Sequence, residues 1–183
     1  GKGGFIKDYV LGGGVGLFIC GSYQLLGHYY KAADGSVLDG LGVFDLYTEH
    51  LGEKAKRCIG NTTARLSSVV SKDPLFAEVS GDFHDLVVGF ENHGGRTYLS
   101  RKAVPFAKIV KGFGNNAMDF TEGVIYKNAI GTYFHGPLLA RNPHLADYLI
   151  YKALKIGQHE IKDLPHQDDS LVYSAHTASI KLK

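Results

Sequence analysis

The segment VGLFICGSYQLL (residues 15–26) determines our expectation of the fold. Its first half, VGLFIC, is a continuous apolar run of strand length, which is typical of a central parallel strand buried on both faces. After Gly21 the apolar residues recur at helical spacing as far as Tyr30, which predicts a helix. A strand, a sharp turn and a helix lift the residue at the turn out of the sheet. That residue is Cys20.

A second apolar strand is predicted in AIGTYFHG (129–136), and His135 lies near its end. If the two strands are neighbours and parallel, their carboxyl ends meet at one edge, where open α/β sheets place their sites. A cysteine nucleophile needs exposure, a nearby base and donors for the oxyanion that it creates. Cys20, His135 and the N–H of Gly21 would supply these. The alternatives are a buried apolar cysteine and a surface histidine that merely ends a strand.

The rest of the chain predicts a single α/β domain over residues 1–183 with a mainly parallel sheet. Residues 50–85 are charged and poorly periodic, so we expect loops with short strands there. Residues 157–183 are mixed and polar, and we expect a weakly ordered or partner-docking tail. The other expected elements are a helix within 4–12, a turn and a short strand within 36–48, strands at 86–92, 107–113 and 123–127, a turn at 93–96, and a helix that begins at Asn142-Pro143.

Composition narrows the classes of function. The net charge of +2 and the lack of a basic stripe argue against nucleic-acid binding. Two cysteines do not make a disulfide framework, which favours a reduced, cytoplasmic setting. The run from Tyr9 to Leu26 carries no charge and is nearly long enough to cross a membrane, but its glycines and Gln24 suit a turn and a bend better. We therefore expect no membrane span.

Four stretches together resemble a known family. They are ICGSYQLLGHYY (19–30), VGFENHGGRTY (88–98), GFGNNAMDFTEGVIYKN (112–128) and GTYFHGPLLARNP (131–143). Their order and content resemble the class I glutamine amidotransferases of the cobyric acid synthase-like branch. Within that branch they are most similar to the glutaminase subunits of lipid II isoglutaminyl synthase. The resemblance runs from about residue 5 to about residue 155.

The resemblance implies a three-layer, flavodoxin-like fold whose first strands and glycine-rich loop would precede residue 1. It implies that Cys20 is the nucleophile, that His135 is the general base and acid, and that Gly21 contributes to the oxyanion hole. Gln24 would shape the pocket for L-glutamine. Arg57 resembles an arginine that clamps the α-carboxylate of glutamine, a task suited to its two parallel donors. The alternative for Arg57 is a solvated loop charge.

The resemblance also implies a partner, a Mur-ligase-like ATP-dependent synthetase that uses the released ammonia to amidate the D-glutamate of lipid II. ATP and metal would belong to that partner, so this chain is expected to hold no cofactor and no metal. Pro137 stands where most class I glutaminases carry the third acid of the triad, which suggests that the partner supplies a carboxylate. For His93, within the polar stretch 91–96, we expect a structural role.

Three other functions stay open at this point. The chain could be the glutaminase part of a cobyrinic or cobyric acid amide synthase. It could be a docking subunit that keeps the fold without the activity. It could also be a Cys–His hydrolase that does not act on glutamine, which the match of several separate motifs disfavours.

Overall fold

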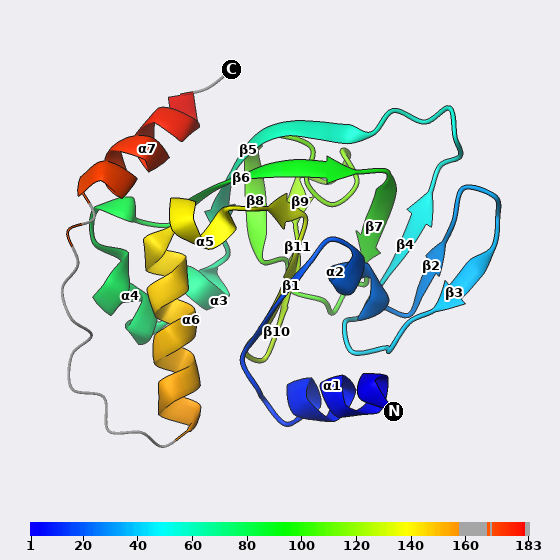
Figure 1. The fold of residues 1–183 in the computed structure, drawn as a ribbon, viewed down its shortest axis with the longest axis horizontal. Helices are drawn as coiled ribbons and strands as arrows, with labels where there is room; N and C mark the ends of the chain where they lie inside the picture. Colours follow the sequence, from blue (N-terminus) through cyan, green and yellow to red (C-terminus); the bar gives the residue numbers. More distant parts are fainter. Residues whose placement is uncertain (158–167, 169, 182–183) are drawn as a thin grey trace.

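The computed structural model describes residues 1–157, 168 and 170–181, and in this part of the chain the strands form three sheets bordered by helices (Figure 1). The expectation of one mainly parallel central sheet is wrong. Only two strand pairs in the described residues are parallel, β1 with β11 and β2 with β4, and the remaining pairs are antiparallel. The fold is mixed α/β.

The first sheet has the order β1-β11-β10 and carries the sequence that opened our argument. Its strands are β1 (Gly16–Ile19), β11 (Ala129–Thr132) and β10 (Val124–Tyr126). β1 and β11 are parallel neighbours, with Ile19 opposite Thr132, so the predicted pairing of these two strands is confirmed. β10 adds an antiparallel edge.

The second sheet has the order β12-β6-β5-β8-β9. Its strands are β12 (Phe134–His135), β6 (Leu86–His93), β5 (Cys58–Leu66), β8 (Ala107–Lys111) and β9 (Thr121–Glu122). The predicted strand 129–136 is thus divided, because Tyr133 leaves the first sheet and Phe134–His135 pairs with β6. The expectation of loops with short strands over 50–85 is also wrong. That stretch contains the long strand β5, helices α3 (Ser68–Ser71) and α4 (Pro74–Ser80), and the 3-10 turn η1 (Gly81–Phe83).

The third sheet has the order β3-β2-β4-β7, and its formation shortens the predicted helix after Cys20. Its strands are β2 (Tyr29–Lys31), β3 (Val37–Asp39), β4 (Leu46–His50) and β7 (Gly95–Leu99). Helix α2 (Gly21–Leu25) ends early because the chain at Gly27 passes against β4. A Cβ atom at Gly27 would lie 2.4 Å from the side chain of Leu46, and the N–H of His28 donates to the Leu46 carbonyl. Strand pairing here overrides helical spacing.

Helices cover the sheets around two apolar clusters. The helices not yet named are α1 (Lys2–Leu11), α5 (Leu138–Arg141), α6 (Pro143–Ile156) and α7 (Ser170–Lys181). Residues of α6 share one cluster with α4 and the second sheet, and residues of α1 and α2 share the other with β11. The uncharged run 9–26 therefore folds as the end of α1, β1 and α2. Within the described ranges, no helix combines the length and hydropathy that a membrane crossing needs.

The predicted helix start at Asn142-Pro143 is confirmed, but Asn142 does not cap it through its side chain. Instead the buried Asn142 amide accepts from the N–H of Val88 and donates to the carbonyls of Val88 and Leu138. It therefore ties the start of α6 to β6, the strand that also pairs with His135.

Helix α7 lies within the predicted tail and packs on this chain. It contacts α5, β5 and β6, and the His176 ring lies edge-on to the rings of Phe83 and His144. Residues 158–167, 169, 182 and 183 of the tail lie outside the described residues. Docking of the tail on a partner stays a prediction.

The contact beneath α7 leads to a prediction about acid stability. Burial, followed by the nearby His176, lowers the pKa of His144 from 6.5 to about 4. The folded protein therefore binds this proton less readily than the unfolded chain. The resulting stability is present above pH 6.5 and is lost as the pH falls toward 4, by about 3 kcal/mol from this residue.

The measurement is urea unfolding between pH 7 and pH 4. We expect His144→Gln to lose markedly less stability over this range than the wild type. His84→Asn, at an exposed histidine with positive φ, serves as the control and should follow the wild-type curve. Equal pH dependence in His144→Gln and the wild type would show that His144 does not titrate in this way.

Candidate active site

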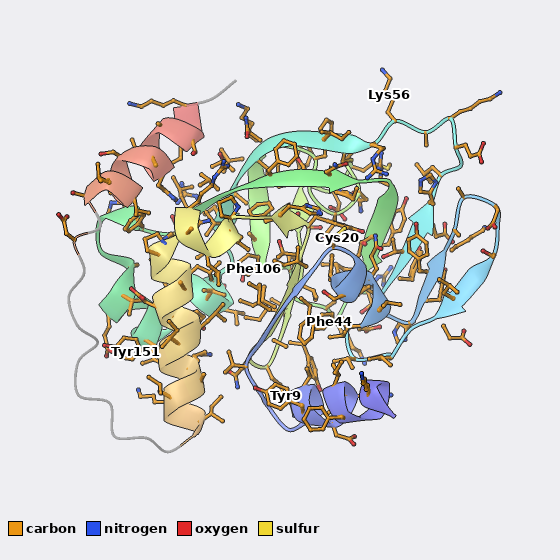
Figure 2. All side chains as sticks on the ribbon, in the orientation of Figure 1. Tyr9, Cys20, Phe44, Lys56, Phe106 and Tyr151 are labelled. Carbon is orange, nitrogen blue, oxygen red and sulfur yellow. The ribbon has the colours of Figure 1, made fainter. Side chains whose placement is uncertain are left out.

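Cys20 occupies the turn between β1 and α2, as the sequence predicts (Figure 2). Its backbone has φ 53° and ψ −109°, a left-handed conformation that is costly for a residue with a Cβ atom. The Cys20 N–H donates to the carbonyl of Thr132 at 2.9 Å, which anchors the turn to β11. The side chain is half-buried and the cysteine is free. A strained, anchored turn with an accessible thiol is typical of a nucleophile site.

The surroundings of Cys20 keep its proton on the sulfur at neutral pH. Burial raises the pKa of the thiol above its ordinary value of 9.0. A hydrogen bond from the Gly21 backbone and the positive charge of Arg57 lower the pKa, but by less than burial raises it. A thiolate would therefore need a base to withdraw the proton at the moment of attack.

His135 follows Thr132 by three residues, so it lies just beyond the carboxyl end of the β1–β11 pair that carries Cys20. It is half-buried and opposite Phe90 in the β12–β6 pairing. Its Nδ1 atom is shielded from solvent and has no hydrogen-bond partner among the described residues. Among the described residues, no carboxylate therefore orients the imidazole through this nitrogen, as the third member of a catalytic triad does.

Gln24 and Arg57 converge on Gly94 and Gly95, where the chain passes from β6 to β7. A Cβ atom at Gly95 would lie 2.9 Å from Nε2 of Gln24, and one at Gly94 would lie 3.3 Å from Nη1 of Arg57. Since Arg57 also acts electrostatically on Cys20, these residues belong to one region of the surface. Gln24 lies one turn after Cys20 on α2, and its N–H bonds to the Cys20 carbonyl.

Arg57 is exposed but not a free loop charge. Its Nε and Nη2 atoms donate to Oδ1 of Asn92 at 3.1 and 2.9 Å, and Nη2 also donates to the Asn92 carbonyl at 3.2 Å. A substrate carboxylate would therefore have to share or displace Asn92. The Arg57 donors that the proposed carboxylate contact needs are thus bonded to Asn92, a neutral acceptor.

Sequence reasoning missed Tyr133 and left the neighbouring stretch 91–96 unplaced. Tyr133 is fully buried, and its hydroxyl accepts from Nε2 of Gln24 at 3.0 Å. The ring of His93 stacks on the Tyr133 ring with centroids 3.6 Å apart, and its Nδ1 bonds to the Gly95 carbonyl. This contact supports the structural role expected for His93. In the sequence, Gly94 and Gly95 beside His93, and a tyrosine two positions before His135, were the features that could have indicated this contact.

A buried acid holds the backbone that leads to His135. Oε1 of Glu122 accepts from the Thr132 hydroxyl at 2.6 Å and from the Tyr133 N–H at 2.8 Å. Burial raises the pKa of Glu122 from 4.5 to about 8, against the effect of these two bonds. Glu122 is therefore mainly protonated at neutral pH and acts as a structural support at the strand break between β11 and β12.

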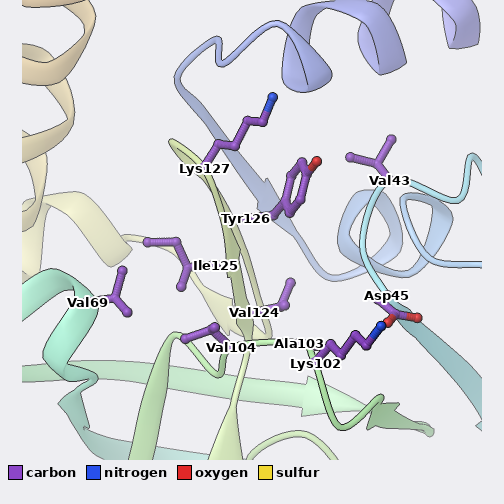
Figure 3. Close-up of a pocket in the computed structure, with 10 residues that line it drawn as sticks. All are labelled: Val43, Asp45, Val69, Lys102, Ala103, Val104, Val124, Ile125, Tyr126 and Lys127. Atoms are coloured by element: carbon purple, nitrogen blue, oxygen red, sulfur yellow. The ribbon is translucent and has the colours of Figure 1, made fainter.

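A cavity of about 410 Å³ lies away from these residues, between β10 and the segments around residues 43 and 103 (Figure 3). It is lined mostly by apolar side chains, and none of the five predicted site residues contributes to it. In the described part of the chain, no group of three or more His, Cys, Asp or Glu side chains is arranged to hold a metal ion.

The protein is a mixed α/β protein with a free cysteine on a strained strand–helix turn, an arrangement that exposes the nucleophile in many α/β enzymes. This chain belongs to the CobB/CobQ-like glutamine amidotransferase domain family, whose sequence pattern matches residues 2–143. That match covers the turn at Cys20, the junction at Gly94 and the strand break before His135.

Three curated proteins are similar to this chain in sequence. The chain is 42% identical to the GatD subunit of the glutamine-hydrolysing lipid II isoglutaminyl synthase of Streptococcus pneumoniae, over 91% of this chain and 58% of that protein. It is 40% identical to the same subunit from Staphylococcus aureus, over 81% and 53%. It is 36% identical to a probable cobyric acid synthase of Methanocaldococcus jannaschii, over 80% and 27%. The chain thus spans little more than half of the two GatD subunits.

A solved glutamine amidotransferase from Thermotoga maritima aligns with 97% of this chain and 63% of its own. The TM-score is 0.47 and the sequence identity is 18%.

Proposed function

We propose that this chain hydrolyses L-glutamine to glutamate and ammonia as the glutaminase subunit of a lipid II isoglutaminyl synthase. The observation that carries the proposal is the strained turn at Cys20, in a member of this amidotransferase family whose relatives at 42% and 40% identity are named GatD subunits of that synthase. The single-domain organisation over residues 1–183 and the cytoplasmic location are part of the same proposal.

The proposed reaction is acyl transfer through a thioester. His135 takes the proton of Cys20, and the sulfur attacks the side-chain carbonyl carbon of glutamine. The N–H of Gly21, whose interaction with the sulfur lowers the pKa of Cys20, would donate to the oxyanion. Protonated His135 then gives its proton to the leaving nitrogen and ammonia departs. Water attacks the thioester, releasing glutamate and restoring the thiol.

Substrate recognition is assigned to Gln24 and Arg57. The Arg57 fork would bind the α-carboxylate in place of Asn92, and its positive charge lowers the pKa of Cys20. Gln24 would contact the substrate from the same face of α2 as the nucleophile. ATP and the acceptor carboxylate of lipid II would be bound by the Mur-ligase-like partner.

The partner is also proposed to complete the catalytic group. Pro137 offers no acid two positions after His135, and Nδ1 of His135 has no partner among the described residues. Because this nitrogen is shielded, a carboxylate from the synthetase would require the imidazole to rotate as the subunits dock. Hydrolysis is then weak until the complex forms.

The test measures glutamate release by the full-length protein with and without its synthetase, together with labelling by a glutamine analogue that alkylates cysteine. We expect labelling at Cys20 and a rate that rises at least about tenfold on complex formation. Equal rates would remove the role of the partner's carboxylate. An unlabelled full-length complex would instead indicate a docking subunit without activity.

The second candidate is the glutaminase part of a cobyric acid synthase. The favouring observation is the 36% identity to the Methanocaldococcus jannaschii protein over 80% of this chain. The two functions share the chemistry at Cys20 and differ in the acceptor. Purification of the synthetase that binds this chain, followed by assays with lipid II and with a corrinoid acid, separates them.

A further inference from the structure

A line of hydrogen-bonding side chains leads from the interior of the molecule to Gln24. The hydroxyls of Thr48 and Thr97 lie 2.7 Å apart, the Thr97 hydroxyl lies 2.6 Å from the Tyr133 hydroxyl, and the Tyr133 hydroxyl lies 3.0 Å from Nε2 of Gln24. Thr48, Thr97 and Tyr133 are completely buried, whereas Gln24 is partly exposed. The line connects β4 and β7 to the segment between β11 and β12, and it ends beside the nucleophile.

The ring of Tyr133 is held independently of its hydroxyl. His93 stacks on one face with an interplanar angle of 7°, and Tyr23 packs edge-on at 5.2 Å. The backbone N–H of Tyr133 donates to Glu122. The hydroxyl therefore has a fixed position, set by packing and by the strand break, before any ligand arrives. Preorganised donors and acceptors of this kind spare a ligand the entropic cost of ordering them.

Gln24 is held at this fixed hydroxyl by the nitrogen of its amide. Nε2 is the end bound to Tyr133, so Oε1 is the end available to a ligand. Gln24 lies one helical turn from Cys20, which brings Oε1 into reach of a molecule bound at the thiol. Oε1 accepts hydrogen bonds and donates none. It suits an N–H group of glutamine and gives no bond to the carboxylate of the product glutamate.

We propose that Tyr133 is a positioning residue for substrate recognition, which fixes the Gln24 carboxamide with its oxygen toward the bound amino-acid amide. The assignment rests on the proposed glutaminase function. Tyr133 itself does not touch the substrate. Its hydroxyl stays protonated, since burial holds the pKa of Tyr133 well above its ordinary value of 10.0, so it acts through hydrogen bonding and not through charge.

The test is Tyr133→Phe in the full-length protein with its synthetase. This substitution removes the hydroxyl and keeps the ring that stacks on His93. We expect the KM for glutamine to rise about tenfold, as for the loss of about one oriented hydrogen bond, while kcat changes by less than about twofold. Alkylation of Cys20 by the glutamine analogue should slow in parallel. Alkylation by iodoacetamide, which needs no recognition, should not.

Tyr23→Phe is the matched control. Tyr23 is equally buried and neighbours Tyr133, but its hydroxyl donates to Asn115 and not to Gln24. It should lose stability without a change in KM. A KM within twofold of the wild type for Tyr133→Phe, or an equal rise in both variants, would overturn the assignment while leaving the glutaminase function standing. A wild type without glutaminase activity would overturn both.

Discussion

Replacement of Cys20 by alanine is expected to lower glutamine hydrolysis by at least about a thousandfold and to leave the fold intact. Every proposed step passes through a bond to the Cys20 sulfur, and the second cysteine of the chain, Cys58, is buried on β5. Alanine keeps the Cβ atom, so the strained backbone of the turn is carried over unchanged. The measurement is glutamate release by the full-length complex, with thermal unfolding of the same samples.

Cys58→Ala is the control for loss of a thiol. Cys58 is the second free cysteine, buried on β5 and paired in register with His93, and it has no part in the proposed reaction. We expect it to reduce stability by about 1–2 kcal/mol and to keep activity. Comparable activity in Cys20→Ala and the wild type would exclude Cys20 as the nucleophile. Loss of activity in both variants would point to damage shared by the two sites.

The second large effect is expected at Glu122 and appears on raising the pH. Because the pKa of Glu122 is about 8 in the folded protein and 4.5 ordinarily, folding favours its protonated form. The stability linked to this proton is complete below pH 4.5 and is lost as the pH rises through 8. The difference of 3.5 in pKa corresponds to about 5 kcal/mol.

Glu122→Gln removes the titration and keeps an oxygen that accepts from Thr132 and Tyr133. We expect the unfolding free energy of this variant to rise by about 4 kcal/mol relative to that of the wild type between pH 5 and pH 9, so that the variant becomes the more stable of the two. Glu78→Gln, at an exposed glutamate of α4, should show no such trend. A constant difference between Glu122→Gln and the wild type over this range would mean that Glu122 is already ionised in the folded state.

Local sequence was sufficient for the part of the site that depends on one strand and one turn. The apolar run before Cys20 and the glycine after it lead to the strand–turn–helix that the structure contains. The parallel pairing of β1 with β11, which the predicted site requires, is also present. The roles of Cys20, Gly21, Gln24, Arg57 and His135 rest on the resemblance and on their placement, and they stay proposals until tested.

What could not be predicted depends on contacts between distant segments. Helical spacing extends through Tyr30, but pairing with β4 converts Tyr29–Lys31 into a strand. The apolar stretch 129–136 gives no sign of a break between two strands. The break arises because Thr132 and Tyr133 bond to Glu122, whereas Phe134 and His135 pair with β6. The expectation of a single parallel sheet was wrong because the pairing of distant segments, which local sequence does not show, produces three separate sheets.

The positive φ of Cys20 sets folding and chemistry against each other at one position. Glycine would adopt this backbone without strain, whereas any residue with a Cβ atom gives up about 1–3 kcal/mol. A search for more stable variants that ignores activity should therefore select glycine at position 20, and by the proposed mechanism that variant could not hydrolyse glutamine. Stability screens of this protein therefore need a measurement of thiol reactivity at position 20, so that variants without the cysteine are recognised.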